Sequence, residues 1–126
     1  MTNLRGEGLR VFRELLPGSL PDDDTEVGFS DGFAPELMDI GIESIFGRLW
    51  SREGLSKRDR SLVTLGILIA LRANDELDAH FRIARTNGLS DAELAEVIYH
   101  ASGYAGFPAA NSARTVAAEA LAAESA

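Results

Sequence analysis

The chain of 126 residues contains no cysteine. Disulfides, thiolate nucleophiles, dithiol redox chemistry and cysteine metal sites are therefore excluded together. Basic residues are also scarce, since 12 Lys and Arg stand against 20 Asp and Glu, which gives a formal net charge of −8. Nucleic-acid binding needs a basic surface, so we expect no nucleic-acid partner. A local arginine cluster can still attract a small anion, so a small-molecule carboxylate substrate is compatible with this charge.

The sequence lacks a stretch that is apolar enough to cross a membrane. Its longest apolar run, 62–71, is interrupted by Thr64 and Gly66, and a spanning helix needs about 20 apolar residues. Residues 1–7 have neither the basic start nor the apolar segment of a signal peptide. We therefore expect a cytoplasmic protein without a membrane partner.

Period-two strand patterns and hairpin signals are absent as well, and apolar residues recur at helical spacing instead. The expected helices are 4–16, 33–50, 56–71, 74–87, 90–101 and 109–123. Their short connections favour antiparallel neighbours. We predict an all-α, single-domain bundle of about six helices over 1–126, with an N-terminal helix and acidic loop in 1–32 and a helical core in 33–126.

The predicted loop at 17–31 contains three consecutive acids, Asp22, Asp23 and Asp24. One interpretation of this acidic triplet is a metal site formed by carboxylates, but three adjacent side chains cannot all face one ion. A solvated acidic turn is the simpler interpretation, and we expect no metal site.

The predicted helix 33–50 has Pro35 in its first turn, a position that suits proline. Gly41 and Gly47 each cost about 1 kcal/mol against alanine in a helix interior, so close approach of another helix is expected there. The side chains expected to face a core are Leu37, Ile40, Ile45 and Leu49.

Ser56 predicts the start of the helix 56–71, and Lys57, Arg58 and Arg60 then oppose the helix dipole in its first turn. Cations at such a place suggest another task, such as holding an anion or pairing across an interface. The continuation 62–71 is apolar nearly all round, which indicates burial at the centre of the domain or between subunits. A buried strand is the rival interpretation, but the length and the cap favour a helix.

Asn74 is the expected cap of the next helix, in which Glu76 and His80 lie four residues apart on one face. Such a pair can transfer protons, or it can be an idle surface pair. His100 lies near a predicted helix end, where its charge would favour the dipole. Neither a two-histidine zinc motif, a Gly-rich phosphate loop nor a Gly-x-Ser-x-Gly elbow occurs. Trp50 and Tyr104 fit core or interface positions more readily than substrate contacts.

From Phe46 onward, about the last two thirds of the sequence, ordered segments resemble the carboxymuconolactone decarboxylase family. The matching segments are Trp50-Ser51-Arg52, Gly54-Leu55, Arg60-Ser61-Leu62-Val63-Thr64, Ala70-Leu71, Glu76-Leu77 with His80, Asn87-Gly88-Leu89, Glu93 with Glu96, and Tyr104-Ala105-Gly106-Phe107-Pro108-Ala109-Ala110-Asn111. The resemblance implies an alkyl hydroperoxide reductase D-like fold. The thiol peroxidases of this family carry a Cys-x-x-Cys pair where this sequence has Ala73 and Glu76, so the resemblance points to the decarboxylase branch. The family often has proline where this sequence has Glu53, which leaves the substrate open.

The resemblance implies a carboxy-lyase that converts 4-carboxymuconolactone to 3-oxoadipate enol-lactone in aromatic catabolism, without a cofactor. It makes His80 and Glu76 the expected catalytic residues, with Glu76 orienting the imidazole. Arg52 and Arg60 are expected to bind the substrate carboxylate, and Trp50, Tyr104 and Asn87 complete the expected substrate site. A homotrimer or homohexamer is also implied. The alternatives are another proton-transfer enzyme of the same fold, such as an isomerase or dehydratase, and a non-catalytic oligomer that binds a small acid.

Overall fold

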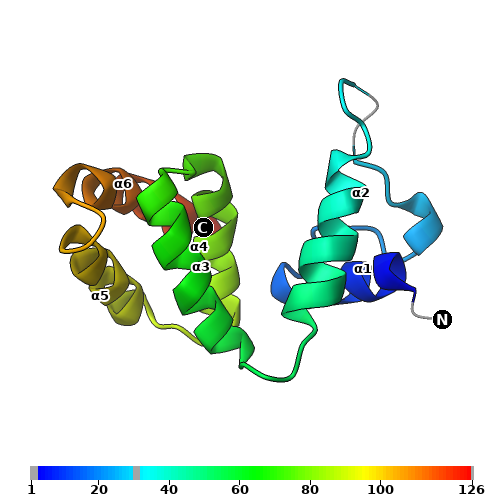
Figure 1. The fold of residues 1–126 in the computed structure, drawn as a ribbon, viewed down its shortest axis with the longest axis horizontal. Coiled ribbons are helices and arrows are strands. Elements are labelled where there is room, and N and C mark those ends of the chain that lie inside the picture. The colour runs from blue at the N-terminus through cyan, green and yellow to red at the C-terminus, as the bar shows by residue number, and fades with distance from the viewer. Residues whose placement is uncertain (1–2, 30–31, 126) are drawn as a thin grey trace. The chain divides into compact units, whose positions relative to one another are not determined.

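The computed structural model describes residues 3–29 and 32–125, and these residues form helices joined by turns, without a strand. The prediction of an all-α fold with about six helices is confirmed (Figure 1). The elements are α1 (Leu4–Leu15), the 3-10 helix η1 (Asp24–Glu26), α2 (Leu37–Gly41), the π-helix η2 (Ile42–Trp50), α3 (Lys57–Leu71), α4 (Asn74–Thr86), α5 (Asp91–Ser102) and α6 (Phe107–Ser125).

The chain divides into two compact units, Met1–Leu55 and Ser56–Ala126. The expected internal boundary at 32/33 therefore differs from the observed one at 55/56, because the helix after the acidic loop packs against α1 within the first unit. Positions 30 and 31 of the expected loop lie outside the described residues. The single-domain organisation over 1–126 stays a prediction.

In the first unit, α1 and η2 approach each other closely at glycines. A Cβ at Gly8 would overlap the carbonyl oxygen of Ile42, and a Cβ at Gly47 would overlap that of Leu4. The predicted close approach is thus confirmed for Gly47 and wrong for Gly41, whose missing Cβ faces open space. Absence of a side chain lets the two backbones touch at Gly47, which explains why a residue unfavourable in helices occurs there.

The helix expected over 33–50 begins at Leu37, so Pro35 lies before the helix rather than in its first turn. The predicted core-facing stripe is also wrong, since its side chains are exposed: Leu37 67%, Ile40 56%, Ile45 45% and Leu49 52%. The buried side chains are Ile42, Phe46 and Trp50. These three positions recur every four residues along η2, and the helix turns this face, rather than the predicted one, toward the interior of the first unit.

The second unit is a bundle in which α3 lies beside α4, and α6 packs against both α4 and α5 (Figure 1). Its core is built from Leu65, Ile69, Leu77, Phe81, Ala84, Leu89, Leu94, Ile98 and the buried alanines of α6. Burial of these apolar side chains supplies the main favourable term for folding of this unit. The small alanine side chains let α6 approach its neighbours closely.

The helix α3 confirms the helical interpretation of 56–71, but it is not buried on every side. Its core face carries Ser61, Leu65 and Ile69, whereas Val63, Ile67 and Leu71 are exposed to 55%, 54% and 70%. The expected position at the centre of the domain is therefore wrong. Its position between subunits stays a prediction.

The helix ends follow their capping signals in part. Ser56 Oγ accepts a hydrogen bond from the Asp59 amide, and Ser90 and Glu93 form a full capping box at the start of α5. The predicted Asn74 cap is wrong, because Asn74 is the first helical residue and Ala73 occupies the cap position without a side-chain bond. No helix within the described ranges is long and apolar enough to span a bilayer.

Candidate active site

His80 lies on the inward face of α4, together with Leu77, Phe81 and Ala84. Its side chain is 8% exposed, and this burial sets its chemistry. Burial lowers the pKa of His80 from 6.5 to about 4, because loss of water disfavours the charged imidazolium. Near neutral pH the ring is therefore neutral, with one nitrogen that donates and one that accepts.

Glu76 occupies the exposed first turn of α4, where a carboxylate complements the helix dipole. No hydrogen bond or ion pair joins Glu76 to His80 among the described side chains. Glu76 and His80 are four residues apart and therefore neighbours on the surface of α4. The side chain of His80 is nevertheless buried, whereas that of Glu76 is exposed to solvent. The expected contact that would orient the imidazole is not formed in this structure.

Asn87 ends α4 and ties it to the beginning of α3. Its Nδ2 donates to Ser61 Oγ at 2.9 Å and to the Lys57 carbonyl oxygen at 3.3 Å. Ser61 is 1% exposed, so the amide satisfies a hydroxyl that the core would otherwise isolate. Both amide hydrogens of Asn87 are used within the fold, which leaves its Oδ1 for the expected substrate contact.

The arginines that precede His80 in the sequence have different surroundings in the structure. Arg58 forms an ion pair with Glu93 of α5, whereas Arg60 lies half-buried in the first turn of α3. Arg52 is exposed in the first unit, two residues after Trp50, which is 5% exposed at the end of η2. Trp50 is buried, as expected of a residue in a core or an interface.

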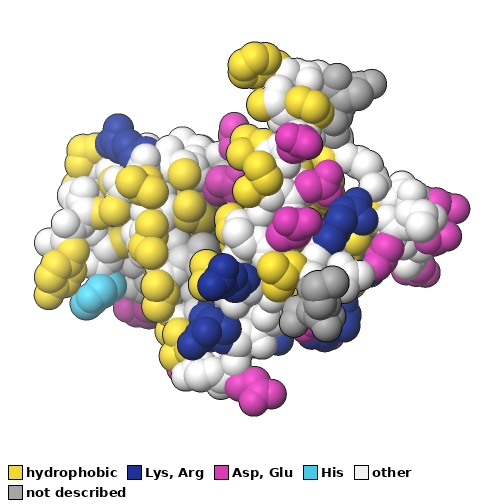
Figure 2. Space-filling model, turned by 45° about the vertical axis from the view of Figure 1, so that its right-hand side comes forward, with side chains coloured by type: hydrophobic (Ala, Val, Ile, Leu, Met, Phe, Trp, Pro, Cys, Tyr) yellow, Lys and Arg dark blue, Asp and Glu magenta, His cyan; other side chains and the backbone are white. Residues whose placement is uncertain are grey.

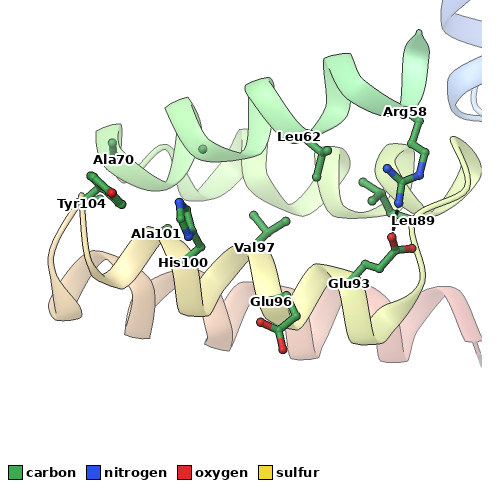
Figure 3. Close-up of a pocket in the computed structure, with 12 residues that line it drawn as sticks. Arg58, Leu62, Ala70, Leu89, Glu93, Glu96, Val97, His100, Ala101 and Tyr104 are labelled. Atoms are coloured by element: carbon green, nitrogen blue, oxygen red, sulfur yellow. Dashed lines mark hydrogen bonds and ion pairs between the residues drawn. The ribbon is translucent and has the colours of Figure 1, made fainter.

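A groove of about 650 Å³ runs between α3 and α5 (Figure 3). Arg58 and Glu93 mark one end, and Ala70, His100 and Tyr104 mark the other, with Leu62 and Val97 between them. The rings of His100 and Tyr104 lie 5.2 Å apart and are tilted by 33°. Leu89, Glu96, Ala101 and Ala105 also line the groove, whereas His80 does not.

The expected site residues therefore do not all converge. Tyr104 is 86% exposed at the α3–α5 groove, whereas His80 lies on the inward face of α4. The groove itself was missed by the sequence reasoning. A usable signal existed, because Arg58, Leu62, Gly66 and Ala70 recur every four residues and share one face of α3. Within residues 3–29 and 32–125, no group of three or more histidine or acidic side chains is arranged to hold a metal ion.

Comparison with known proteins identifies the family. The model of the carboxymuconolactone decarboxylase family matches residues 35–119. The chain is 49% identical over 113 residues to the 4-carboxymuconolactone decarboxylase of Acinetobacter baylyi, covering 90% of this chain and 83% of the relative. It is 32% identical over 102 residues to the nitrosuccinic acid decarboxylase of Metarhizium robertsii, covering 81% and 70%. An uncharacterized 15.0 kDa protein of Paracoccus denitrificans is 33% identical over 78 residues, covering 60% and 58%. This chain belongs to the carboxymuconolactone decarboxylase family.

Proposed function

We propose that this protein is a carboxy-lyase that decarboxylates a small carboxylated lactone of the 4-carboxymuconolactone type in the catabolism of aromatic compounds. The observation that carries the proposal is His80, a buried and neutral imidazole in a chain that is 49% identical to a 4-carboxymuconolactone decarboxylase. The proposal includes cofactor-free chemistry and a cytoplasmic location.

The reaction needs a group that stabilises a developing negative charge. Cleavage of the bond between the ring carbon and its carboxylate releases CO2 and leaves the electron pair on the ring. That pair delocalises as a dienolate onto the lactone carbonyl oxygen. A fixed hydrogen-bond donor at this oxygen lowers the barrier, because its dipole is already oriented when the charge appears.

His80 supplies such a donor in this proposal. A neutral imidazole donates one N–H hydrogen bond to the oxyanion. The ring carbon then takes up one proton from solvent, which completes the lactone product and leaves the imidazole neutral. The low pKa of His80 keeps the imidazolium from forming in the resting enzyme at neutral pH. The ring can therefore act as donor without an unpaired buried cation.

The carboxylate that remains on the substrate requires a cation. Arg60, at the half-buried start of α3, and Arg52 are the proposed partners, since a guanidinium can bind a carboxylate through two parallel hydrogen bonds. Trp50, Tyr104 and the Oδ1 of Asn87 are proposed to contact the rest of the substrate.

A homotrimer or homohexamer is part of the same proposal. Many large apolar side chains are exposed on the single chain, among them Phe33 at 101% and Leu71 at 70%. Exposed apolar patches of this kind mark contacts with other chains more often than free surface.

The test is decarboxylation of 4-carboxymuconolactone by wild type, His80→Ala and His80→Gln, followed as CO2 release and lactone product. We expect both variants to lose at least about a hundredfold in kcat. His100→Ala is the matched control, because it removes the other histidine of the chain, and we expect wild-type turnover for it. Wild-type turnover in His80→Ala would overturn the proposal, provided that circular dichroism shows a folded variant.

A nitro-substituted acid is the second candidate substrate, because a relative that is 32% identical is named nitrosuccinic acid decarboxylase. Loss of CO2 beside a nitro group leaves a nitronate, whose oxygens need the same hydrogen-bond donor as the dienolate. The two substrates are therefore compared in the same assay. A higher kcat/KM for nitrosuccinate than for the lactone would reassign the substrate but keep the reaction class.

A further inference from the structure

The first turn of α3 carries three cations at the end of the helix where the dipole disfavours them. Lys57, Arg58 and Arg60 all lie in this turn. The chain has a net charge of −8, and basic side chains occupy only a small part of the face drawn in Figure 2 (dark blue), so this turn is a local concentration of positive charge. A turn of this kind frays unless other parts of the fold hold it, because like charges and the dipole both oppose it.

Asn87, at the end of α4, holds this turn at two points. Its Nδ2 donates to the Lys57 carbonyl oxygen at 3.3 Å and to Ser61 Oγ at 2.9 Å. The two acceptors are four residues apart, about one helical turn, and Arg60 lies between them. We call this arrangement of Lys57, Ser61 and Asn87 the amide clamp. Because Ser61 is buried, water does not compete for its contact with Asn87, and the clamp limits the movement of the backbone at Arg60.

A second contact ties the same turn to α5. The Arg58 guanidinium forms an ion pair with Glu93, whose other carboxylate oxygen accepts a hydrogen bond from the Ser90 amide. The turn is thus held from two directions, by the end of α4 and by the start of α5. Within this turn, Arg58 has a partner on α5, and Arg60 is the arginine that the proposed function assigns to the substrate carboxylate.

The amide clamp also sets the position of this turn relative to His80. On α4, His80 precedes Asn87 by seven residues, which is two helical turns or about 10 Å along the helix axis. Because α3 packs against α4, a bond at the Asn87 end limits how far α3 can slide along α4. A site that binds a carboxylate at one point and stabilises an oxyanion at another depends on this separation, since a misplacement of about 1 Å already slows such reactions.

We propose that Ser61 and Asn87 are positioning residues that hold Arg60 in place for the carboxylate of the substrate. The inference rests on the proposed function, because it needs Arg60 as the carboxylate ligand and His80 as the hydrogen-bond donor. It adds the buried Ser61 to the residues that act on the reaction, and it gives Asn87 a task that requires no contact with substrate. Release of the clamp lets Arg60 move while the imidazole keeps its surroundings, so substrate binding weakens and the chemical step keeps its rate.

The first experiment measures the kinetics of Ser61→Ala with 4-carboxymuconolactone. We expect KM to rise at least about fivefold and kcat to change by less than about twofold, because the lost interaction acts on substrate binding. A merely structural role gives the opposite pattern, since loss of folded enzyme lowers the apparent kcat and leaves KM unchanged. Thr86→Ala is the matched control, because its exposed hydroxyl donates to the Arg82 carbonyl oxygen within α4, and both constants should equal those of wild type. An unchanged KM in Ser61→Ala would overturn the proposal.

The second experiment repeats the measurement in the Arg60→Gln background. There Ser61→Ala should raise KM by less than about 1.5-fold further, because a guanidinium that is absent cannot be displaced. Asn87→Ala removes the clamp from its half-buried end and should behave like Ser61→Ala in both backgrounds, which keeps the test decisive if Ser61→Ala does not fold. A rise in KM that persists at full size without Arg60 would overturn the proposal and would favour direct contact between Asn87 and the substrate.

These outcomes are separable from those of the proposed function. Turnover that is present in wild type and lost in His80→Ala supports the decarboxylase whatever the clamp variants show. Turnover in wild type with an unchanged KM in both clamp variants overturns the inference alone. Absence of turnover in wild type with the lactone and with nitrosuccinate overturns both.

Discussion

Asn87 Nδ2 donates to Ser61 Oγ at 2.9 Å, which joins the end of α4 to the start of α3 inside the second unit. Ser61 is 1% exposed and is flanked by the apolar core residues of α3. A buried hydroxyl of this kind needs a partner, because water cannot reach it. The asparagine that the family resemblance assigned to substrate binding thus has a structural task as well.

Ser61→Ala tests that task. The substitution removes the acceptor of the Asn87 amide and leaves a half-buried donor without its partner, so we expect a loss of about 1–3 kcal/mol in the free energy of unfolding. Urea denaturation measures the difference. Ser44→Ala, an exposed serine on η2, should change stability by less than about 0.5 kcal/mol. Equal stability of the two variants would show that the Ser61–Asn87 bond contributes nothing.

The two glycines of the second predicted helix should respond in opposite directions to alanine. At Gly47 the added methyl group overlaps the Leu4 carbonyl oxygen, so Gly47→Ala should cost about 1–3 kcal/mol through displacement of α1. At Gly41 the methyl group faces open space, so Gly41→Ala should stabilise by up to about 1 kcal/mol through helix propensity. Thermal denaturation of the two variants compares them directly. Stabilisation by Gly47→Ala would contradict the close contact of α1 and η2.

Burial of His80 makes folding depend on pH. The pKa of His80 is lowered from 6.5 to about 4 in the folded chain, so between these values the unfolded chain binds the extra proton. Stability contributed by the neutral ring is therefore complete above pH 6.5, decreases as the pH falls toward 4 and decreases no further below that. The loss from pH 7.5 to pH 5.5 should be about 1.3 kcal/mol. Urea denaturation at both pH values should show this loss for wild type and not for His80→Gln, and equal pH dependence of the two would refute it.

The same low pKa predicts the pH profile of catalysis. A neutral His80 stays active well below pH 6.5, so kcat/KM for 4-carboxymuconolactone should be flat between pH 5.5 and pH 8. Initial rates at low substrate concentration give the profile. A fall in kcat/KM with an apparent pKa between 6 and 7 would show that the free enzyme carries a solvent-accessible catalytic imidazole instead.

Glu76→Gln separates the two interpretations of the Glu76–His80 pair. Because Glu76 is exposed and does not contact His80, neutralising it should lower kcat by less than about threefold. Asp75→Gln is the control, since it removes the neighbouring carboxylate in the same helix turn. A tenfold or larger loss for Glu76→Gln alone would mean that the carboxylate reaches the imidazole during turnover.

Helix existence was predictable here because the signals are local. The Ser56 cap and the Ser90–Glu93 capping box each act within four residues, and both lie at the predicted starts of their helices. The outward orientation of Leu37 and Leu49 was not predictable, because it depends on which face of this helical segment meets α1. The contact of η2 with α1 joins residues far apart in sequence.

Within the candidate site, the sequence pointed to His80 but not to its state of protonation. The residue type of His80 and its place among the ordered segments that resemble the family were enough to choose this histidine. Only the packing of α4 shows that its ring is buried and that its pKa is lowered. The spacing of Glu76 and His80 suggested a contact, yet a shared helix face does not settle whether that face points to the core or to water.

The sequence by itself determined the all-helical class, most helix boundaries, the exclusion of thiol chemistry and the family, because composition, caps and ordered motifs are properties of the chain alone. The tertiary structure decided which surroundings each helix face has: the burial of His80, the Ser61–Asn87 hydrogen bond, the exposure of Val63, Ile67 and Leu71 on α3, and the groove between α3 and α5. These features arise from contacts between helices, and periodicity in one helix cannot specify the angle at which another packs against it.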